Sequence, residues 1–500
     1  MIWDCVQERD QSDGGMKPGW KRWQNHERGV LLATMNCQPF TSRPLASWGE
    51  FLILAVLGGF GTAMAAVHEV GPGKPLNSLR EVPWEALGPG DEVRIHWRAQ
   101  PYAEKWALCT RGTADRPIVV RGISGPGGRL PVIDGRDATT RSQLNYWGQE
   151  RGVLKIGGTN LTTHIIPGHL IVENLEIRSG RRPHVFHGRK GRTSYSKDAA
   201  SVNVEIVEHL VLRNLVLHDS SNGLLVSPQS KDVRVERCRL YDNGNPGSIS
   251  EHNAYTECLG MVYEGNWFGP LRAGCRGNNL KDRSAGLVVA CNWIEGGNRQ
   301  LDLVEAMGNP AINAAPEYRR TVVYGNVLIE REGDGNNQIV HYGGDMGDAT
   351  TYRKGTLQFY HNTVISTRLS PVAIFRLSSP DESVECWNNI LHAATGGKNL
   401  TLMVTVGTLK LGKNWLTRGW VTSYEAFEGR VDEMGPLLNG AAPGWSSGEK
   451  QDFRLNQDSP CWQAAAKLPE GWPVPGQCYD KHQKVILRSD DGRSLNLGAF

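Results

Sequence analysis

A short pattern that ends in asparagine recurs along most of this chain and limits the folds open to it. An apolar run with alternating polar positions leads to the asparagine, and a second apolar run follows it, as in Ile171-Val-Glu-Asn-Leu-Glu-Ile177. The recurrences lie 24 to 40 residues apart. The slot is held by Asn174, Asn214, Asn266, Asn292, Asn326, Asn362 and Asn389, and by Cys238 in one variant.

This repeat is typical of a solenoid of short strands. Period-two alternation indicates β-strands, and the shortest steps suit one coil while the longer steps contain loops. Asparagine tolerates the left-handed corner conformation, and its amide can pair with the coils above and below. A leucine-rich repeat would need a leucine framework that this chain lacks, and an all-β sandwich is the remaining alternative. We therefore predict an all-β, right-handed, single-stranded parallel β-helix with loop insertions.

The repeat begins only well inside the chain. Residues 1–50 are polar and have no period, so we interpret them as an N-terminal extension. Residues 51–65 are an apolar run that follows Arg43 and ends in Ala63-Met64-Ala65, as in the core of a secretory signal. The run is shorter than the roughly 20 residues of a membrane span, although a membrane anchor is the alternative. We expect residues 67–500 to form the solenoid with its cap and tail.

Net charge and the export signal limit the partners. The formal charge of +3 over 500 residues is too small to indicate nucleic acid, and it permits an acidic substrate. We expect a monomer in the bacterial periplasm or secreted medium, with no stable membrane insertion once the signal is removed.

The strands before the corners share a set of polar residues. Tyr255 and Lys281 each lie eleven residues before their corner asparagine, so they should be neighbours on coils about 4.8 Å apart. Asp302 or Glu305, and then His341, should occupy the next two coils. These residues predict a polar stripe with acid, base and cation within reach, against the alternative of a solvated charged ladder.

The same stretch carries a resemblance. His252-Asn-Ala-Tyr255, Lys281-Asp-Arg283 and Leu301-Asp-Leu303 resemble a series found in exported bacterial β-helix proteins. More broadly, the chain is similar to the pectate-lyase-like superfamily, including its chondroitinase-B and alginate-lyase branch. The resemblance implies a polysaccharide lyase that cleaves an acidic, uronic-acid-containing polysaccharide by β-elimination.

β-Elimination assigns roles to the stripe. The uronate carboxylate must be neutralised, a base must take the carbon-bound proton, and an acid should protonate the leaving oxygen. We expect Lys281 to be the base, with its pKa lowered by the nearby Arg283. Arg283 would bind the carboxylate in bidentate fashion. Tyr255 or His252 would be the acid, or would exchange roles with Lys281.

Further residues complete the predicted site. The insertion 178–197 is basic and would suit a polyanionic sugar chain, although it could also be a solubilising loop. The predicted substrate-binding residues are Asn253, Asp302, His341, Arg182 and Arg189. In the resembling lyases a calcium ion often assists, and the oxygen ligands here would be Asp302, Glu305 and Asn279.

Three other functions remain open on the same fold. A glycoside hydrolase would need two carboxylates from among Asp282, Asp302 and Glu305, and Asp282 should point inward. A C5-epimerase shares the proton abstraction of the lyase. A non-catalytic carbohydrate-binding solenoid would need none of this chemistry.

Overall fold

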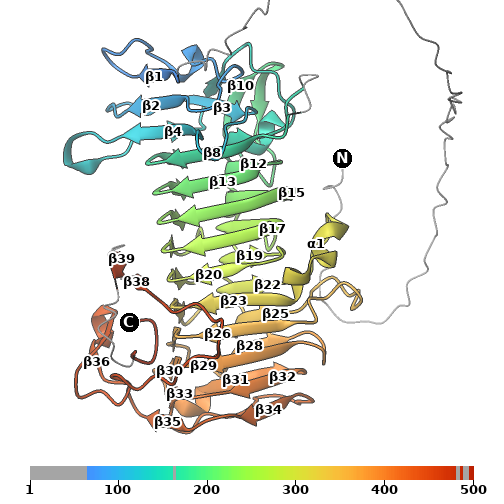
Figure 1. The fold of residues 1–500 in the computed structure, drawn as a ribbon, viewed down its shortest axis with the longest axis vertical. Helices are drawn as coiled ribbons and strands as arrows, with labels where there is room; N and C mark the ends of the chain where they lie inside the picture. The colour runs from blue at the N-terminus through green and yellow to red at the C-terminus, as the bar shows by residue number, and fades with distance from the viewer. Residues whose placement is uncertain (1–64, 161–164, 480–484, 488–494) are drawn as a thin grey trace, which may run out of the picture. The chain divides into compact units, whose positions relative to one another are not determined.

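The computed structural model describes residues 65–160, 165–479, 485–487 and 495–500. Ala65–Phe500 form one compact unit built almost entirely of strands (Figure 1). The predicted extension 1–50 and all of the predicted signal core except Ala65 lie outside the described residues. The strands stack in parallel along one axis, so the predicted parallel β-helix is confirmed.

Three ladders of parallel strands form the faces of the helix. The first ladder is β3 (Glu104–Leu108), β7 (Gly152–Ile156), β12 (Ala200–Val204), β15 (Asn222–Glu236), β17 (Ala254–Glu264), β19 (Leu280–Asp282), β22 (Leu301–Leu303), β25 (Gln338–Tyr342), β28 (Val372–Leu377) and β31 (Leu400–Thr405). The second ladder is β1 (Val67–Val70), β2 (Glu92–His96), β4 (Ile118–Ile123), β8 (Gly168–Glu173), β13 (Glu208–Arg213), β15, β17, β20 (Val288–Ala290), β23 (Arg320–Tyr324), β26 (Thr356–Tyr360), β29 (Ser383–Trp387), β32 (Thr408–Leu411) and β34 (Arg430–Glu433). The third ladder is β5 (Val132–Asp134), β9 (Glu176–Arg178), β14 (Val216–His218), β16 (Arg239–Tyr241), β18 (Trp267–Phe268), β21 (Trp293–Glu295), β24 (Val327–Glu330), β27 (Thr363–Ser366), β30 (Ile390–Ala393), β33 (Asn414–Thr417) and β35 (Leu437–Gly440).

The remaining elements decorate the coils. They are β6 (Ala138–Thr140), the hairpin β10 (Val185–Gly188) and β11 (Gly191–Ser194), β36 (Trp445–Ser447), β37 (Asp452–Leu455), β38 (Gln477–Tyr479), β39 (Val485–Leu487) and the helix α1 (Pro310–Ala314). Short 3-10 turns are η1 (Leu79–Glu81), η2 (Pro126–Gly128), η3 (Gln149–Arg151), η4 (Pro316–Arg319), η5 (Gly397–Asn399) and η6 (Gly448–Lys450).

Alternation along the first ladder separates the core from the surface. Leu280, Leu301, Val340, Phe375 and Met403 are in register, and all five are fully buried. The residue after each of them points the opposite way. Burying such side chains stabilises the fold by about 1.5–3 kcal/mol each, so this inward row fixes which residues form the outer face.

The asparagine corners are confirmed, with one correction to their detail. From Asn266 to Asn389 each side-chain oxygen accepts from the preceding corner, as where both nitrogens of Asn292 donate to Asn326 Oδ1 at 2.9 and 3.0 Å. The residue before each of these asparagines takes the left-handed conformation. Asn174 and Asn214 are instead left-handed themselves, with φ of 60° and 51°. The predicted left-handed asparagine is therefore found at Asn174 and Asn214, whereas the later five asparagines each lie one residue beyond the left-handed position.

The C-terminal tail packs on the third ladder, whereas residues 421–427 before it lie beside β31 of the first ladder. Phe453 and Tyr479 pack with Trp293, Ile329 and Ile365 of the third ladder, and Leu455 and Cys461 pack with Ile390 and Trp415. The tail thus covers apolar side chains on the outside of the third ladder.

Candidate active site

The predicted polar stripe lies on the outer face of the first ladder. Tyr255 is paired in register with Lys281, Lys281 with Asp302, and Asp302 with His341. The equal distance to the corner therefore predicted the pairing of Tyr255 with Lys281, and the ladder places Asp302, one of the two candidates for the next coil, and then His341 beside them.

Lys281 is held between two carboxylates. Its Nζ lies 2.6 Å from Asp302 Oδ2 and 2.5 Å from Asp345 Oδ2. The position of Asp302 follows from the ladder register. The position of Asp345 does not, because Asp345 lies in the loop after β25. It was not among the residues of the predicted site.

Arg283 joins the same group and links it to Tyr255. Its Nη2 lies 3.1 Å from Asp345 Oδ1, and its Nη1 lies 3.1 Å from Glu305 Oε2. Its Nε donates a hydrogen bond of 3.0 Å to the Tyr255 hydroxyl. We call Lys281, Arg283, Asp302, Glu305 and Asp345 the ion-pair cluster.

The charge state of Lys281 differs from the prediction. Burial alone would lower its pKa, but the carboxylates of Asp302 and Asp345 outweigh burial and raise the pKa above its ordinary value. Arg283 does lower the pKa of Lys281, as predicted, but the two carboxylates outweigh it, so the predicted net lowering is wrong. Burial opposes the charge on Asp345, yet Lys281 and Arg283 hold its pKa at about 2. Lys281, Arg283, Asp302 and Asp345 are therefore charged at neutral pH, whereas burial and the nearby Asp345 raise the pKa of Glu305.

Two histidines flank the cluster as neutral groups. Burial, with Lys281 nearby, lowers the pKa of His252 to about 3, and its Nδ1 accepts from the Asn278 amide at 2.9 Å. His341 Nδ1 lies 2.8 Å from Asp302 Oδ1 and its Nε2 lies 2.8 Å from Ser378 Oγ, while burial lowers its pKa. The His252 ring meets the Tyr255 ring edge-on, with centroids 5.4 Å apart.

Other predicted site residues lie away from the outer face. Asn253 and Asn279 are fully buried in a second amide row, where Asn253 Nδ2 donates to Asn279 Oδ1 at 2.8 Å. They precede their strands, so the alternation argument does not apply to them. Arg182 Nε donates to the Tyr195 carbonyl and Arg189 Nη1 to the Ser142 carbonyl, both near the β10–β11 hairpin. We leave these four residues out of the site proposed below.

The predicted calcium ligands do not converge. Asp302 already accepts from Lys281, His341 and Asn278. Glu305 binds Arg283 and the main-chain amides of residues 345 and 346, and Asn279 is in the interior row. In the described part of the chain, no three His, Cys, Asp or Glu side chains come together as a metal site. The donor set therefore does not fit calcium, and no step below uses it.

A polar cavity of about 540 Å³ opens beside the cluster. It is lined by the loops that lead from the third ladder into the first, including Arg272, Arg276, Arg331 and Asn298. Asn298 Nδ2 lies 3.5 Å from Asn278 Oδ1, and Asn278 in turn donates to Asp302 at 2.8 Å. The cavity thus adjoins the ladder at the coil of Asp302.

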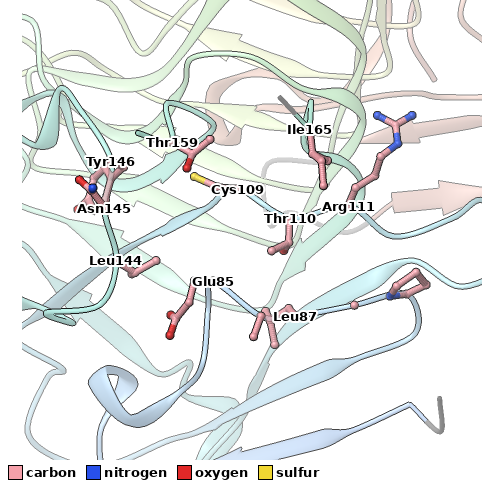
Figure 2. A pocket seen from close by; sticks show the side chains of 13 residues that line it. Glu85, Leu87, Cys109, Thr110, Arg111, Leu144, Asn145, Tyr146, Thr159 and Ile165 are labelled. Carbon is pink, nitrogen blue, oxygen red and sulfur yellow. The ribbon is translucent and has the colours of Figure 1, made fainter. Parts of the chain in front are cut away.

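A second cavity, of about 260 Å³, lies among the first coils (Figure 2). Its charged lining residues are Glu85 and Arg111, and each is paired, Glu85 with Arg141 and Arg111 with Glu208. Burial raises the pKa of the Cys109 thiol in this cavity to about 11. These groups are neutral or compensated, so we do not assign the chemistry to this cavity.

Comparison with known proteins gives a likeness of structure only. No family model matches the chain, and no curated protein matches it. The pectate lyase Pel9A is 12% identical with a TM-score of 0.48, over 88% of this chain and 97% of that one. An alginate lyase from Paenibacillus sp. str. FPU-7 is 11% identical with a TM-score of 0.40, over 70% and 95%. A GH136 lacto-N-biosidase from Eubacterium ramulus is 13% identical with a TM-score of 0.38, over 75% and 68%.

These values carry no residue roles across to this chain. The assignment of the fold rests on the strand pairings, and the argument on function rests on the cluster. None of the described helices is long and apolar enough to cross a membrane. The predicted export and monomeric state stay predictions.

Proposed function

We propose that this protein is a polysaccharide lyase that cleaves a uronic-acid-containing polysaccharide by β-elimination on the outer face of the first ladder. One observation carries the proposal: Lys281 and Arg283 together bind a carboxylate, that of Asp345, with one oxygen each. The bound group comes from a surface loop, and its side chain is 28% exposed. A uronate carboxylate that displaced Asp345 would meet the same two cations.

Neutralising the uronate is the first requirement of the reaction, because the negative charge of a free carboxylate opposes removal of the neighbouring proton. Lys281 stays protonated, and its 10% exposed side chain is fixed by Asp302, which is 1% exposed. A preorganised cation in a partly dry site stabilises developing charge better than water does. Lys281 and Arg283 are therefore proposed as the carboxylate-binding pair.

Tyr255 is proposed as the proton-transfer group. The hydrogen bond from Arg283 Nε holds its oxygen in place, and the deprotonated form of Tyr255 would accept the proton from the carbon next to the carboxylate. The carbon–oxygen bond to the leaving sugar then breaks, a carbon–carbon double bond forms, and the phenol returns its proton to the leaving oxygen. This exchanges the roles first expected for Tyr255 and Lys281.

The exposure of the carboxylates argues against the hydrolase alternative. Hydrolysis needs two carboxyl groups that both reach the glycosidic bond. The side chains of Asp302 and Glu305 are each 1% exposed and hydrogen-bonded, and Asp282 is fully buried. Among these acids and Asp345, only Asp345 is open to a sugar chain.

The test is to incubate the protein with a panel of uronic-acid polysaccharides and follow the ultraviolet absorbance of the unsaturated uronate. We expect rising absorbance with the wild type and none with Tyr255→Phe, which should still bind the polymer. Lys281→Arg should retain part of the activity if Lys281 acts by charge, and none if it is the base. New reducing ends without absorbance would favour hydrolysis. Binding without either signal would favour an epimerase or a non-catalytic protein, and a deuterium-exchange assay would separate these.

A further inference from the structure

We infer that Arg376 and Arg299 form a second anion site on the first ladder, which binds another carboxylate of the same polysaccharide chain. The inference rests on the proposed function and defines its substrate further. It names a polymer with acid groups on more than one sugar residue along the bound stretch.

Arg376 continues the outer row of the ladder. It is paired in register with His341, which is paired with Asp302. Its side chain is partly exposed, and within the described residues it makes no hydrogen bond or ion pair. Its Nε is buried without a partner. Withdrawing a guanidinium donor from water without an acceptor is costly, and a bound anion would remove that cost.

Arg299 faces the same place and is also incompletely paired. Its Nη2 donates to Gln338 Oε1 at 2.9 Å, but its Nη1 lies 3.5 Å from Asp302 Oδ1, which His341 already occupies. Its Nε is buried without a partner. Burial lowers the pKa of Arg299, and Arg376 adds to this effect while Asp302 opposes it. The two guanidinium groups thus repel each other, and the carboxylate that pairs with Arg299, that of Asp302, is also bound by Lys281 and His341.

The spacing indicates what the site would hold. Lys281, Asp302, His341 and Arg376 occupy four successive coils, so the Cα atoms of the first and last lie about 14 Å apart at 4.8 Å per coil. This separation is longer than one sugar ring. The carboxylate at Lys281 and Arg283 and the carboxylate at Arg376 must therefore belong to different residues of one chain.

The test compares short and long acidic oligosaccharides. Oligomers of two and six residues, prepared from each polymer of the panel above, are titrated by calorimetry into the Tyr255→Phe protein and into the same protein with Arg376→Gln. We expect Arg376→Gln to lower the ratio of hexamer to dimer affinity by about tenfold, as for loss of one charge-assisted contact. The dependence of the hexamer affinity on salt concentration should also become weaker in Arg376→Gln. Arg320→Gln removes one exposed arginine charge from the second ladder and is the matched control.

Each outcome decides a separate point. An unchanged ratio would overturn the second anion site and leave the proposed function standing. An equal loss for dimer and hexamer would also overturn it, because Arg376 would then act at the first site. Failure of the protein to bind any oligomer of the panel would overturn the proposed function and the inference together.

Discussion

Asp345 occupies the place proposed for the substrate carboxylate, so its removal should strengthen substrate binding. The substitution Asp345→Asn keeps the shape of the side chain and removes its charge. A hydrogen bond to a charged group contributes about 1.5–3 kcal/mol, and Asp345 makes one to Lys281 and one to Arg283. Solvent screening at a side chain that is 28% exposed reduces this contribution, and so does the Asp302–Lys281 pair, which stays in place. We therefore take about 1–2 kcal/mol as the free energy needed to displace the Asp345 carboxylate.

The displacement energy appears directly in the apparent affinity, since a ligand binds only the fraction of molecules with a free site. At about 1.4 kcal/mol per tenfold, Asp345→Asn should lower the dissociation constant for an acidic oligosaccharide by about 5- to 30-fold. The assay is calorimetric titration of the Tyr255→Phe protein with and without Asp345→Asn. Asp348→Asn is the control, because it removes a charge from the same loop. The Asp348 carboxylate accepts hydrogen bonds from Thr350 and forms no ion pair within the described residues. Weaker or unchanged binding by Asp345→Asn would refute the displacement argument.

Three further predictions concern the scaffold around the cluster. Arg353→Met should lower the free energy of unfolding by about 3–5 kcal/mol in a denaturant titration, because it leaves the fully buried Asp282 without its cation. If the double variant with Asp282→Asn is no more stable than Arg353→Met alone, loss of the ion pair is not the cause. Asn326→Ala should cost about 2–4 kcal/mol by the same method, since its Nδ2 donates to Asn362 and its Oδ1 accepts from the corner before it; a loss below 1 kcal/mol would contradict the ladder argument. Finally, the pKa values of Asp302 and Asp345 are lowered in the folded protein, so these carboxylates contribute to the free energy of unfolding. This contribution is complete above about pH 4, the ordinary carboxyl pKa, and is lost as the pH falls toward about 2. Unfolding curves that coincide at pH 5 and pH 2.5 would refute this prediction.

The fold and the ladder register could be predicted from sequence because both depend on local repetition. Each coil contacts only its neighbours, so equal distances to the corner asparagine place Tyr255 and Lys281 side by side. Asp302 and His341 lie 24 and 21 residues before their corners, so only the order of the coils, and not this count, placed them. The prediction failed at Asn253 and Asn279, because alternation holds only inside a strand and these residues precede theirs.

The residues that sequence reasoning missed act from outside the repeat. Asp345 is in a loop of irregular length, and nothing in the coil period places its carboxylate against a lysine 64 positions earlier. Together with the larger effect of Asp302, its carboxylate raises the pKa of Lys281, against the predicted lowering. The chain near Asp345 offers one signal, the pair of glycines before it, which shows that a tight turn follows the strand of His341. Arg376 lies one coil beyond His341, outside the four coils of the predicted stripe.

The strands β15 and β17 run from the first ladder into the second, and the segment after β22 folds back over their corner: Met307 and Gly308 donate to Glu257 Oε1 at 2.8 and 2.7 Å, and Asn309 Nδ2 donates to the Pro228 carbonyl at 3.0 Å. Two coils further on, the same corner carries residues 304–319 with α1, and then the loop of Asp345 (Figure 1). A polysaccharide on this face would therefore meet one continuous wall along this corner, from the coil of β15 to the loop of Asp345. Side branches that point toward this corner would be excluded. A polymer branched on that side should then resist digestion, and removal of its branches should restore cleavage.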